Sequence, residues 1–179
     1  MSMKQISETK KWLETVVIAH NICPFAERVF KNNGIRFEVE TATEIETCLL
    51  NLILECEHLD TDENIETTLL IYPNAFADFE AYLDFLELAQ GLLEVQNYEG
   101  VYQLASFHPN YCFEGSAEND AANYTNRSPY PMLHLLRESS LERALANYKN
   151  PEKIPDNNVK LTRELGLEKM KQTLAACYE

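Results

Sequence analysis

The sequence predicts an α/β domain in which a small, mainly parallel sheet of three or four strands is covered by helices and followed by a helical C-terminal tail. Three strand-like segments support this prediction: residues 35–40, 67–72 and 101–107. They alternate with segments of helical periodicity and are joined to them by short turns. Strands that alternate with helices are typical of parallel sheets with right-handed crossover connections.

The N-terminal part of the chain is expected to be helical. Apolar residues recur at spacings of three to four between Trp12 and Val17, which indicates a helix with one buried side. Pro24 disfavours helical backbone at Cys23 but suits the first turn of a new helix, which we expect over residues 25–32.

The next segments are expected to form the first half of the sheet and the helices around it. Residues 35–40 alternate strictly between apolar and polar side chains, as in a strand at or near a sheet edge. Residues 45–56 have the apolar spacing of an amphipathic helix. Residues 67–72 form a short apolar run that ends before Pro73, which predicts a central strand, and a helix is expected over residues 76–93.

The remaining segments complete the expected fold. The third strand is followed by residues 111–113, which are a candidate for a fourth. A helix is expected over residues 131–148, with Ser128 as a candidate cap. The helical tail is expected over residues 158–177, with an interruption near Gly166.

The composition favours one globular domain over residues 1–179. The chain is 45% hydrophobic and 25% charged, as is usual for globular proteins. Its net charge of -14 argues against binding to nucleic acid or to anionic membrane surfaces, because both require a basic surface. No apolar run reaches the length of a membrane span, and the N-terminus lacks the features of a signal peptide, so we expect a cytoplasmic protein.

The five cysteines are odd in number, scattered and without a Cys-x-x-Cys pair, which argues against a disulfide framework or a zinc ribbon. Cys48 and Cys56 fall on an apolar helical stripe and are expected to be buried. Cys23 has two interpretations. A helix start could lower its thiol pKa and permit thiol chemistry, or the residue could simply fill the junction between two helices.

A block of unusual composition, residues 107–138, is the candidate functional site. It follows the third strand as a long connection rich in amides, hydroxyls and prolines, and such connections are usually functional or disordered. Disorder is a poor explanation, because the aromatic residues of the block supply apolar surface area that a solvated linker lacks. His108 directly follows the strand, and ligands in open parallel sheets bind beyond the carboxyl ends of strands.

Four residues of this block are candidates for acid–base catalysis. His108 could be a general base, a metal ligand or a donor to an anion, or it could hold the turn by bonding loop backbone. His134 and Glu138 are four residues apart in the expected helix, so an imidazole and a carboxylate would share one face. That pair could orient a catalytic histidine, contribute to a metal site, or be a plain surface pair. Asp120 is a loop carboxylate that could act as a base or a ligand.

A second group of residues suggests an anionic ligand. Residues 123–137 contain two arginines and no acidic residue, although the whole chain is acidic. Backbone amides at a helix start together with an arginine suit a phosphate or a carboxylate, and the alternative is a capped helix preceded by an Asx-turn. The candidate substrate-binding residues are Arg127, Arg137, Asn123, Asn126 and Ser128.

Several motifs resemble a bacterial family known as domain of unknown function 1415. They are Asn-x-Cys-Pro-Phe-Ala from Asn21, Ala-Ser-Phe-His-Pro from Ala105, Asn-Arg-Ser-Pro-Tyr-Pro from Asn126, and His-Leu-Leu-Arg-Glu from His134. The resemblance covers most of the chain and implies no reaction, since the family has no established activity. The candidate residues named above all fall on its matching positions.

A shorter stretch resembles a different class of enzyme. Cys23-Pro-Phe-Ala-Glu-Arg followed by residues 34–39 is similar to the active-site segment of omega-class glutathione transferases. That resemblance implies a thioredoxin fold, which requires a strand before the cysteine.

The leading hypothesis is therefore an enzyme that acts on a small anionic substrate through a histidine of the 107–138 block. One alternative is a metal-binding protein that uses His108, His134 and a carboxylate. A second is a non-enzymatic binding protein whose polar block is structural, and a third is thiol chemistry at Cys23. The residues assign no cofactor and no oligomeric state.

Overall fold

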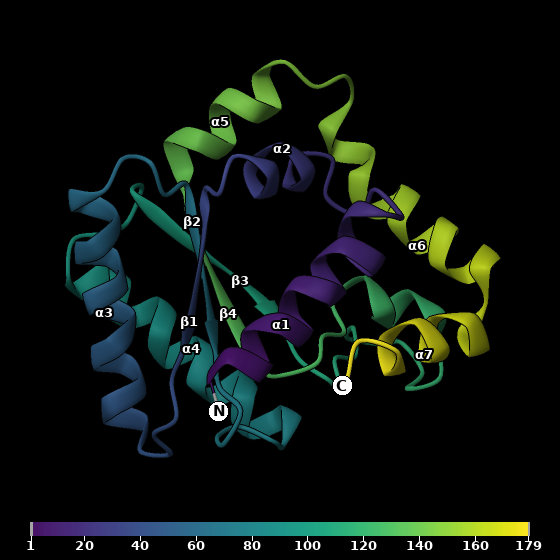
Figure 1. Ribbon diagram of the computed structural model, residues 1–179, viewed down its shortest axis with the longest axis horizontal. Coiled ribbons are helices and arrows are strands. Elements are labelled where there is room, and N and C mark those ends of the chain that lie inside the picture. The colour runs from purple at the N-terminus through teal and green to yellow at the C-terminus, as the bar shows by residue number, and fades with distance from the viewer. Residues whose placement is uncertain (1, 179) are drawn as a thin grey trace.

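The computed structural model describes residues 2–178 and has a mixed α/β architecture, with a sheet enclosed by helices (Figure 1). Over this range the sheet has four strands in the spatial order β1-β2-β4-β3. The strands are β1 (Ile35–Val39), β2 (Thr67–Ile71), β3 (Tyr102–Phe107) and β4 (Met132–Arg137). The predicted edge position of the first strand and the central position of the second are confirmed.

The sheet is mixed, so the prediction of a mainly parallel sheet is wrong. Only β1 and β2 are parallel, and β4 is antiparallel to both of its neighbours. The error comes from residues 132–137, which form β4 although the sequence predicts a helix over 131–148. After β3 ends, the connection returns the chain to the same end of the sheet, and β4 therefore runs back between β3 and β2. Residues 111–113 lie in that connection and not in a strand.

The helices account for most of the remaining chain. The first, α1, continues without a break into the π-helix η1. Within residues 2–178 no helix has the length and apolar composition needed to cross a membrane. The helical segments are α1 (Ser2–Trp12), η1 (Leu13–Ile18), α2 (Ala26–Lys31), α3 (Ile45–Thr61), α4 (Phe79–Val95), the 3-10 helix η2 (Ala121–Thr125), α5 (Glu138–Ala146), the 3-10 helix η3 (Pro151–Lys153), α6 (Ile154–Leu165) and α7 (Leu167–Ala175).

Two apolar cores lie on opposite faces of the sheet. On one face, α3 and α4 pack against Leu70 of β2 and against Leu133 and Leu135 of β4. On the other, α1, η1 and α7 pack against Ile71 and Met132. Because side chains alternate along a strand, β4 contributes leucines to the first core and directs His134 toward the second face.

The helical N-terminus excludes the strand that a thioredoxin fold would need before Cys23. Residues 13–18 are π-helical, and the chain then turns into α2 at Ala26. The new helix after Pro24 agrees with the sequence prediction, whereas the fold implied by the resemblance to glutathione transferases is not formed.

The C-terminal tail is interrupted at Gly166, as predicted. This residue separates α6 from α7 and has φ 86° and ψ 153°, a conformation that is essentially restricted to glycine. The break allows α7 to turn back and place Met170 in the second core.

We predict opposite effects for alanine at two glycines. Gly166→Ala should lower the free energy of unfolding by about 1–3 kcal/mol, because a side chain disfavours this backbone conformation. Gly91→Ala in α4 should raise it by about 0.5–1 kcal/mol, because an added Cβ there meets no heavy atom within 4 Å and alanine favours helix. Urea unfolding of both variants measures the two values, and equal effects would contradict the assigned backbone role of Gly166.

Candidate functional site

A cavity of about 300 Å³ lies on the second face of the sheet, beneath the N-terminal helices. This volume is at the lower end of the range for small-molecule sites, roughly 300–1,000 Å³. Trp12, Leu13 and Val17 form one wall, and Ala105, Phe107, His134 and Leu136 of β3 and β4 lie on the sheet side. The short helices α2 and α5, which lie near each other at the top of Figure 1, complete it through Val29, Leu141 and Ala144.

The sheet contributes two ionisable side chains to this cavity, His134 and Arg137, and His134 is the one that could transfer a proton near neutral pH. Its neighbours in the ladders are Leu69 of β2 and Ala105 of β3, and its ring lies 6.0 Å from that of Phe107. Neither ring nitrogen makes a hydrogen bond to any residue of the described chain, 2–178. Burial lowers the pKa of His134 to about 4, so the ring is neutral at neutral pH. A neutral imidazole offers one donor and one acceptor to whatever enters the cavity.

The other polar groups that line the cavity are already engaged or are uncharged. The Thr125 hydroxyl donates to Ala122 O at 2.9 Å, and Asn126 Nδ2 donates to Ser106 O at 3.1 Å. Cys23 also lines the cavity, and burial raises its thiol pKa more than hydrogen bonds from the backbone of Phe25 and Ala26 lower it. This direction is opposite to the one that thiol chemistry at Cys23 requires.

A second, larger depression of about 790 Å³ adjoins the cavity. The two share six lining residues: Phe25, Arg28, Glu66, Arg137, Ser140 and Ala144. The depression adds polar groups from Glu63, Ser139, Arg143 and Asn147. The apolar cavity therefore continues into a charged outer region.

His108 occupies a different place from His134. It is fully buried at the end of β3 and packs against the rings of Phe79 and Tyr82, both at 5.1 Å, on the α4 side of the sheet. Its Nε2 lies 2.8 Å from Phe76 O, and its Nδ1 accepts from Asn110 N at 3.0 Å. These bonds assign the proton to Nε2, and burial lowers the pKa of the ring. His108 holds its turn, as the structural alternative for this residue expects.

The two histidines consequently lie on opposite faces of the sheet and cannot share an ion in this arrangement. Among residues 2–178 there is also no group of three or more His, Cys, Asp and Glu side chains close enough to hold a metal.

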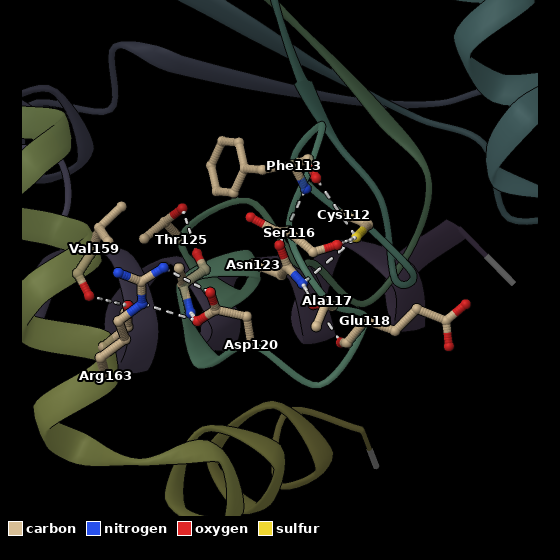
Figure 2. Close-up of polar contacts among 12 residues, drawn as sticks. Cys112, Phe113, Ser116, Ala117, Glu118, Asp120, Asn123, Thr125, Val159 and Arg163 are labelled. Carbon is tan, nitrogen blue, oxygen red and sulfur yellow. Dashed lines mark hydrogen bonds and ion pairs between the residues drawn. The ribbon is translucent and has the colours of Figure 1, made fainter.

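Asn123 is the centre of the long connection between β3 and β4 (Figure 2). It is fully buried, and its Oδ1 accepts from Phe113 N at 3.0 Å. Its Nδ2 donates to Ala117 O at 2.9 Å and to Glu118 O at 3.4 Å. One amide thereby satisfies three backbone groups of a connection whose only regular structure, among the described residues, is the short 3-10 helix η2.

Asp120 anchors the same connection to the C-terminal tail. Its Oδ1 accepts from Ala122 N at 2.9 Å and caps η2, and its carboxylate forms two bonds of 3.1 and 2.7 Å with the guanidinium of Arg163 in α6 (Figure 2). The hydrogen bond from Arg163 lowers the pKa of Asp120 to about 2. Asp120 is therefore ionised and paired outside the cavity.

The two arginines predicted to bind an anion are bonded to backbone carbonyls. Arg127 donates to Tyr111 O and Glu118 O, both at 3.0 Å, and lies over the ring of Tyr124. Arg137 donates to Leu59 O at 2.6 Å and to Ile65 O at 3.1 Å. Arg127 thereby stabilises the β3–β4 connection, and Arg137 stabilises the segment between α3 and β2.

The predicted pair of His134 and Glu138 on one helical face does not form, because His134 lies in β4 and Glu138 begins α5. The Ser128 hydroxyl donates to Tyr130 O at 2.6 Å and does not cap a helix. Of the nine predicted site residues, His134, Asn126 and Arg137 line the cavity, and the others do not. The catalytic and binding roles themselves stay predictions.

Several cavity residues could not be identified from the sequence. Trp12, Leu13 and Val17 follow a helical stripe that is typical of an ordinary core, and Arg28, Ser140 and Arg143 have no unusual local pattern. The π-helical turn next to the cavity is a feature that is often found at functional sites, but it has no sequence signature.

Comparison with known protein families gives a match over most of the chain. The model of a family described as "Protein of unknown function (DUF1415)" matches residues 4–172. No curated protein and no solved structure matches the chain.

We predict that Asn123→Ala lowers the free energy of unfolding by about 2–3 kcal/mol, because buried backbone groups lose their partners. Asn74→Ala is the matched control, because Asn74 is exposed and makes one bond, to Thr41 O, so its loss should cost less than about 1 kcal/mol. Urea unfolding compares the two variants, and similar values would exclude a central structural role for Asn123.

A second prediction concerns the acid sensitivity of His134. Its folded pKa of about 4 lies below the ordinary value, so the unfolded chain takes up the proton first as the pH falls. The stability contributed by the neutral ring is complete above about pH 6.5 and is lost as the pH approaches 4, up to about 3 kcal/mol in total. His134→Leu should therefore lose less stability than the wild type between pH 7 and pH 4.5 in urea unfolding.

The control for this measurement is His58→Gln, since His58 lies outside the cavity. It should keep the acid sensitivity of the wild type. Equal pH dependence of wild type and His134→Leu would show that the pKa of His134 is not lowered.

Proposed function

We propose that this chain, which belongs to the DUF1415 family of proteins of unknown function, binds a small anionic molecule in the cavity beside His134 and acts on it with His134 as the acid–base residue. Family membership supplies no reaction, so the proposal rests on the cavity. The observation that carries it is an imidazole that lines an apolar cavity without a hydrogen-bond partner in the described chain.

His134 is half-buried, and its ring nitrogens are open to the cavity instead of being bonded to the protein. Thr125 and Asn126, which also line the cavity, donate their hydrogen bonds to backbone carbonyls and not to the imidazole. A ligand group inside the cavity would provide the missing partner. An apolar pocket with a few polar groups and an ionisable residue of perturbed pKa is the usual form of a small-molecule site.

The environment of His134 suits an anionic substrate. The apolar walls keep the imidazole neutral, so it is ready to accept a proton or a hydrogen bond at neutral pH. A negative charge bound nearby would favour the protonated ring and raise its pKa toward the physiological range. Substrate binding would then strengthen His134 as a base, which is the condition for efficient general acid–base catalysis.

The second candidate is a binding protein without catalysis. It is favoured by the hydrogen bonds of His108, Asn123 and Arg127, which support a structural role for much of the polar block. Under this alternative the same cavity holds a ligand, and His134 only bonds to it. His134→Gln separates the two, because an amide can replace the hydrogen bond but cannot transfer the proton.

We predict that Ala105→Leu blocks the cavity. Ala105 lies opposite His134 in the β3–β4 ladder and lines the cavity, so a larger side chain there should fill space rather than disturb packing. Octanoate, a small anion with an apolar chain, serves as the probe ligand. Its binding should weaken at least tenfold, while the free energy of unfolding stays equal to that of the wild type or increases. Fluorescence of Trp12 reports binding, because it is the single tryptophan of the chain and lines the cavity.

The matched control is Ala81→Leu, an identical change at an exposed position of α4. It should leave octanoate binding unaltered. Wild-type affinity in Ala105→Leu would place the ligand elsewhere and refute the proposed site.

A further inference from the structure

We propose that the ligand of this cavity is an amphipathic anion whose apolar part occupies the cavity and whose carboxylate or phosphate group binds at the mouth to Arg143 and Ser140. This inference rests on the proposed function and specifies the class of substrate. It also assigns the anion to residues other than those that the sequence suggested.

The first argument is the continuity of an apolar and a polar space. The inner cavity, of about 300 Å³, is lined mainly by apolar side chains, and the adjoining depression, of about 790 Å³, is lined mainly by charged and hydroxyl-bearing side chains. A ligand that fills both must therefore be apolar at one end and polar at the other.

The second argument is the position of α5. Leu141 of this helix lines the cavity, Ser139 and Arg143 line the depression, and Ser140 and Ala144 line both. None of the residues of α5 is fully buried. The apolar side of the helix therefore faces space that a ligand could fill, and the boundary between the two environments runs along α5.

The third argument is the balance of charge at the mouth. Arg28 forms a bidentate pair with Glu66, with distances of 3.1 and 2.9 Å. Arg137 is committed to the carbonyls of Leu59 and Ile65. Among the three arginines that line the depression, these two are already neutralised or occupied.

Arg143 is the arginine at the mouth whose N–H donors are largely open, since Arg137 keeps its charge but directs its donors to backbone carbonyls. Its Nη2 donates to Ser140 Oγ at 2.9 Å, and it has no carboxylate partner in the part of the chain that the structure describes. A guanidinium has five N–H donors, so most of them are available to a ligand. The Ser140 hydroxyl, fixed by Arg143, can donate its own proton to the same anion.

The opposing charge is Glu63, a carboxylate that also lines the depression. The whole chain carries a net charge of -14, so its long-range field repels anions. An anionic ligand is consequently favoured only where local cations outweigh both effects, and at the mouth Arg143 is the cation with open donors while Arg137 adds its charge.

The experiment compares octanoate with octanol, which have the same chain length and differ in charge, by titration of Trp12 fluorescence. A carboxylate loses more hydration than a hydroxyl on leaving water, so octanoate binds more tightly only if the protein compensates its charge. We expect the wild type to prefer octanoate about three- to tenfold, in line with one charge-assisted contact at an exposed site. Octyl phosphate in place of octanoate identifies which anion the mouth prefers.

Arg143→Gln should abolish the preference for octanoate and leave octanol affinity unchanged. Glu63→Gln should increase the preference. The matched control is Lys169→Gln, which removes the same charge from an exposed position of α7 outside both spaces and should retain the wild-type preference.

The results that would contradict the anion subsite differ from those that would contradict the proposed function. Equal wild-type affinities for octanoate and octanol would overturn the anion subsite while leaving the cavity intact as a binding site. Equal loss of both ligands in Arg143→Gln would also overturn it, since the arginine would then act on the fold. If the wild type binds neither octanoate, octanol nor octyl phosphate, the proposed function itself fails.

Discussion

The pairing of β4 with both β2 and β3 is the constraint on which the candidate site depends. Its ladders fix the alternation that places Leu133 and Leu135 among the helices α3 and α4 and turns His134 toward the opposite face. The pairing in turn requires the chain to leave β3, cross the end of the sheet and return. That connection exposes many backbone groups, and Asn123, Arg127 and His108 bond to them. Much of the polar block is thus the means by which β4 reaches its position.

The sequence predicts the fold where local pattern and tertiary structure agree. The strict alternation of residues 35–40, the apolar run of residues 67–72 and the break at Gly166 all correspond to observed features. β4 is the exception, because Met-Leu-His-Leu-Leu-Arg consists largely of residues with high helix propensity. Its strand conformation comes from the two neighbouring ladders, which no local pattern reveals.

The site is predictable only in part, for a related reason. The sequence points to residues 107–138 and includes His134, which does line the cavity. The sequence cannot distinguish an arginine whose N–H donors are free to bind a ligand from one that donates to backbone carbonyls. Arg127 and Arg137 both donate to carbonyls. The walls of the cavity are mainly apolar residues from segments far apart in the chain. An apolar residue that lines a cavity has the same sequence pattern as one that packs in a filled core, so the sequence does not reveal the cavity.

The structure also joins the cavity wall to the polar block. Trp12 Nε1 donates to Arg127 O at 2.9 Å, and the ring of Trp12 meets that of Phe107 at 5.1 Å. The π-helix that begins at the next residue, Leu13, lines the cavity from the same side. A change in the loop around Arg127 would thus move a wall of the cavity, which gives the loop an indirect influence on whatever binds there.

The lack of fully buried residues in α5 has a kinetic consequence. Segments that bury little apolar area open with a low free energy and ahead of global unfolding. The amides of α5 are therefore expected to exchange with solvent sooner than those of α3 or α4, whose side chains form the first core. A ligand could enter and leave by displacing this one short helix while both cores stay closed. A ligand that fills the cavity would then slow the hydrogen exchange of α5. Ligand binding would therefore change how often this helix opens and would leave the fold itself unchanged.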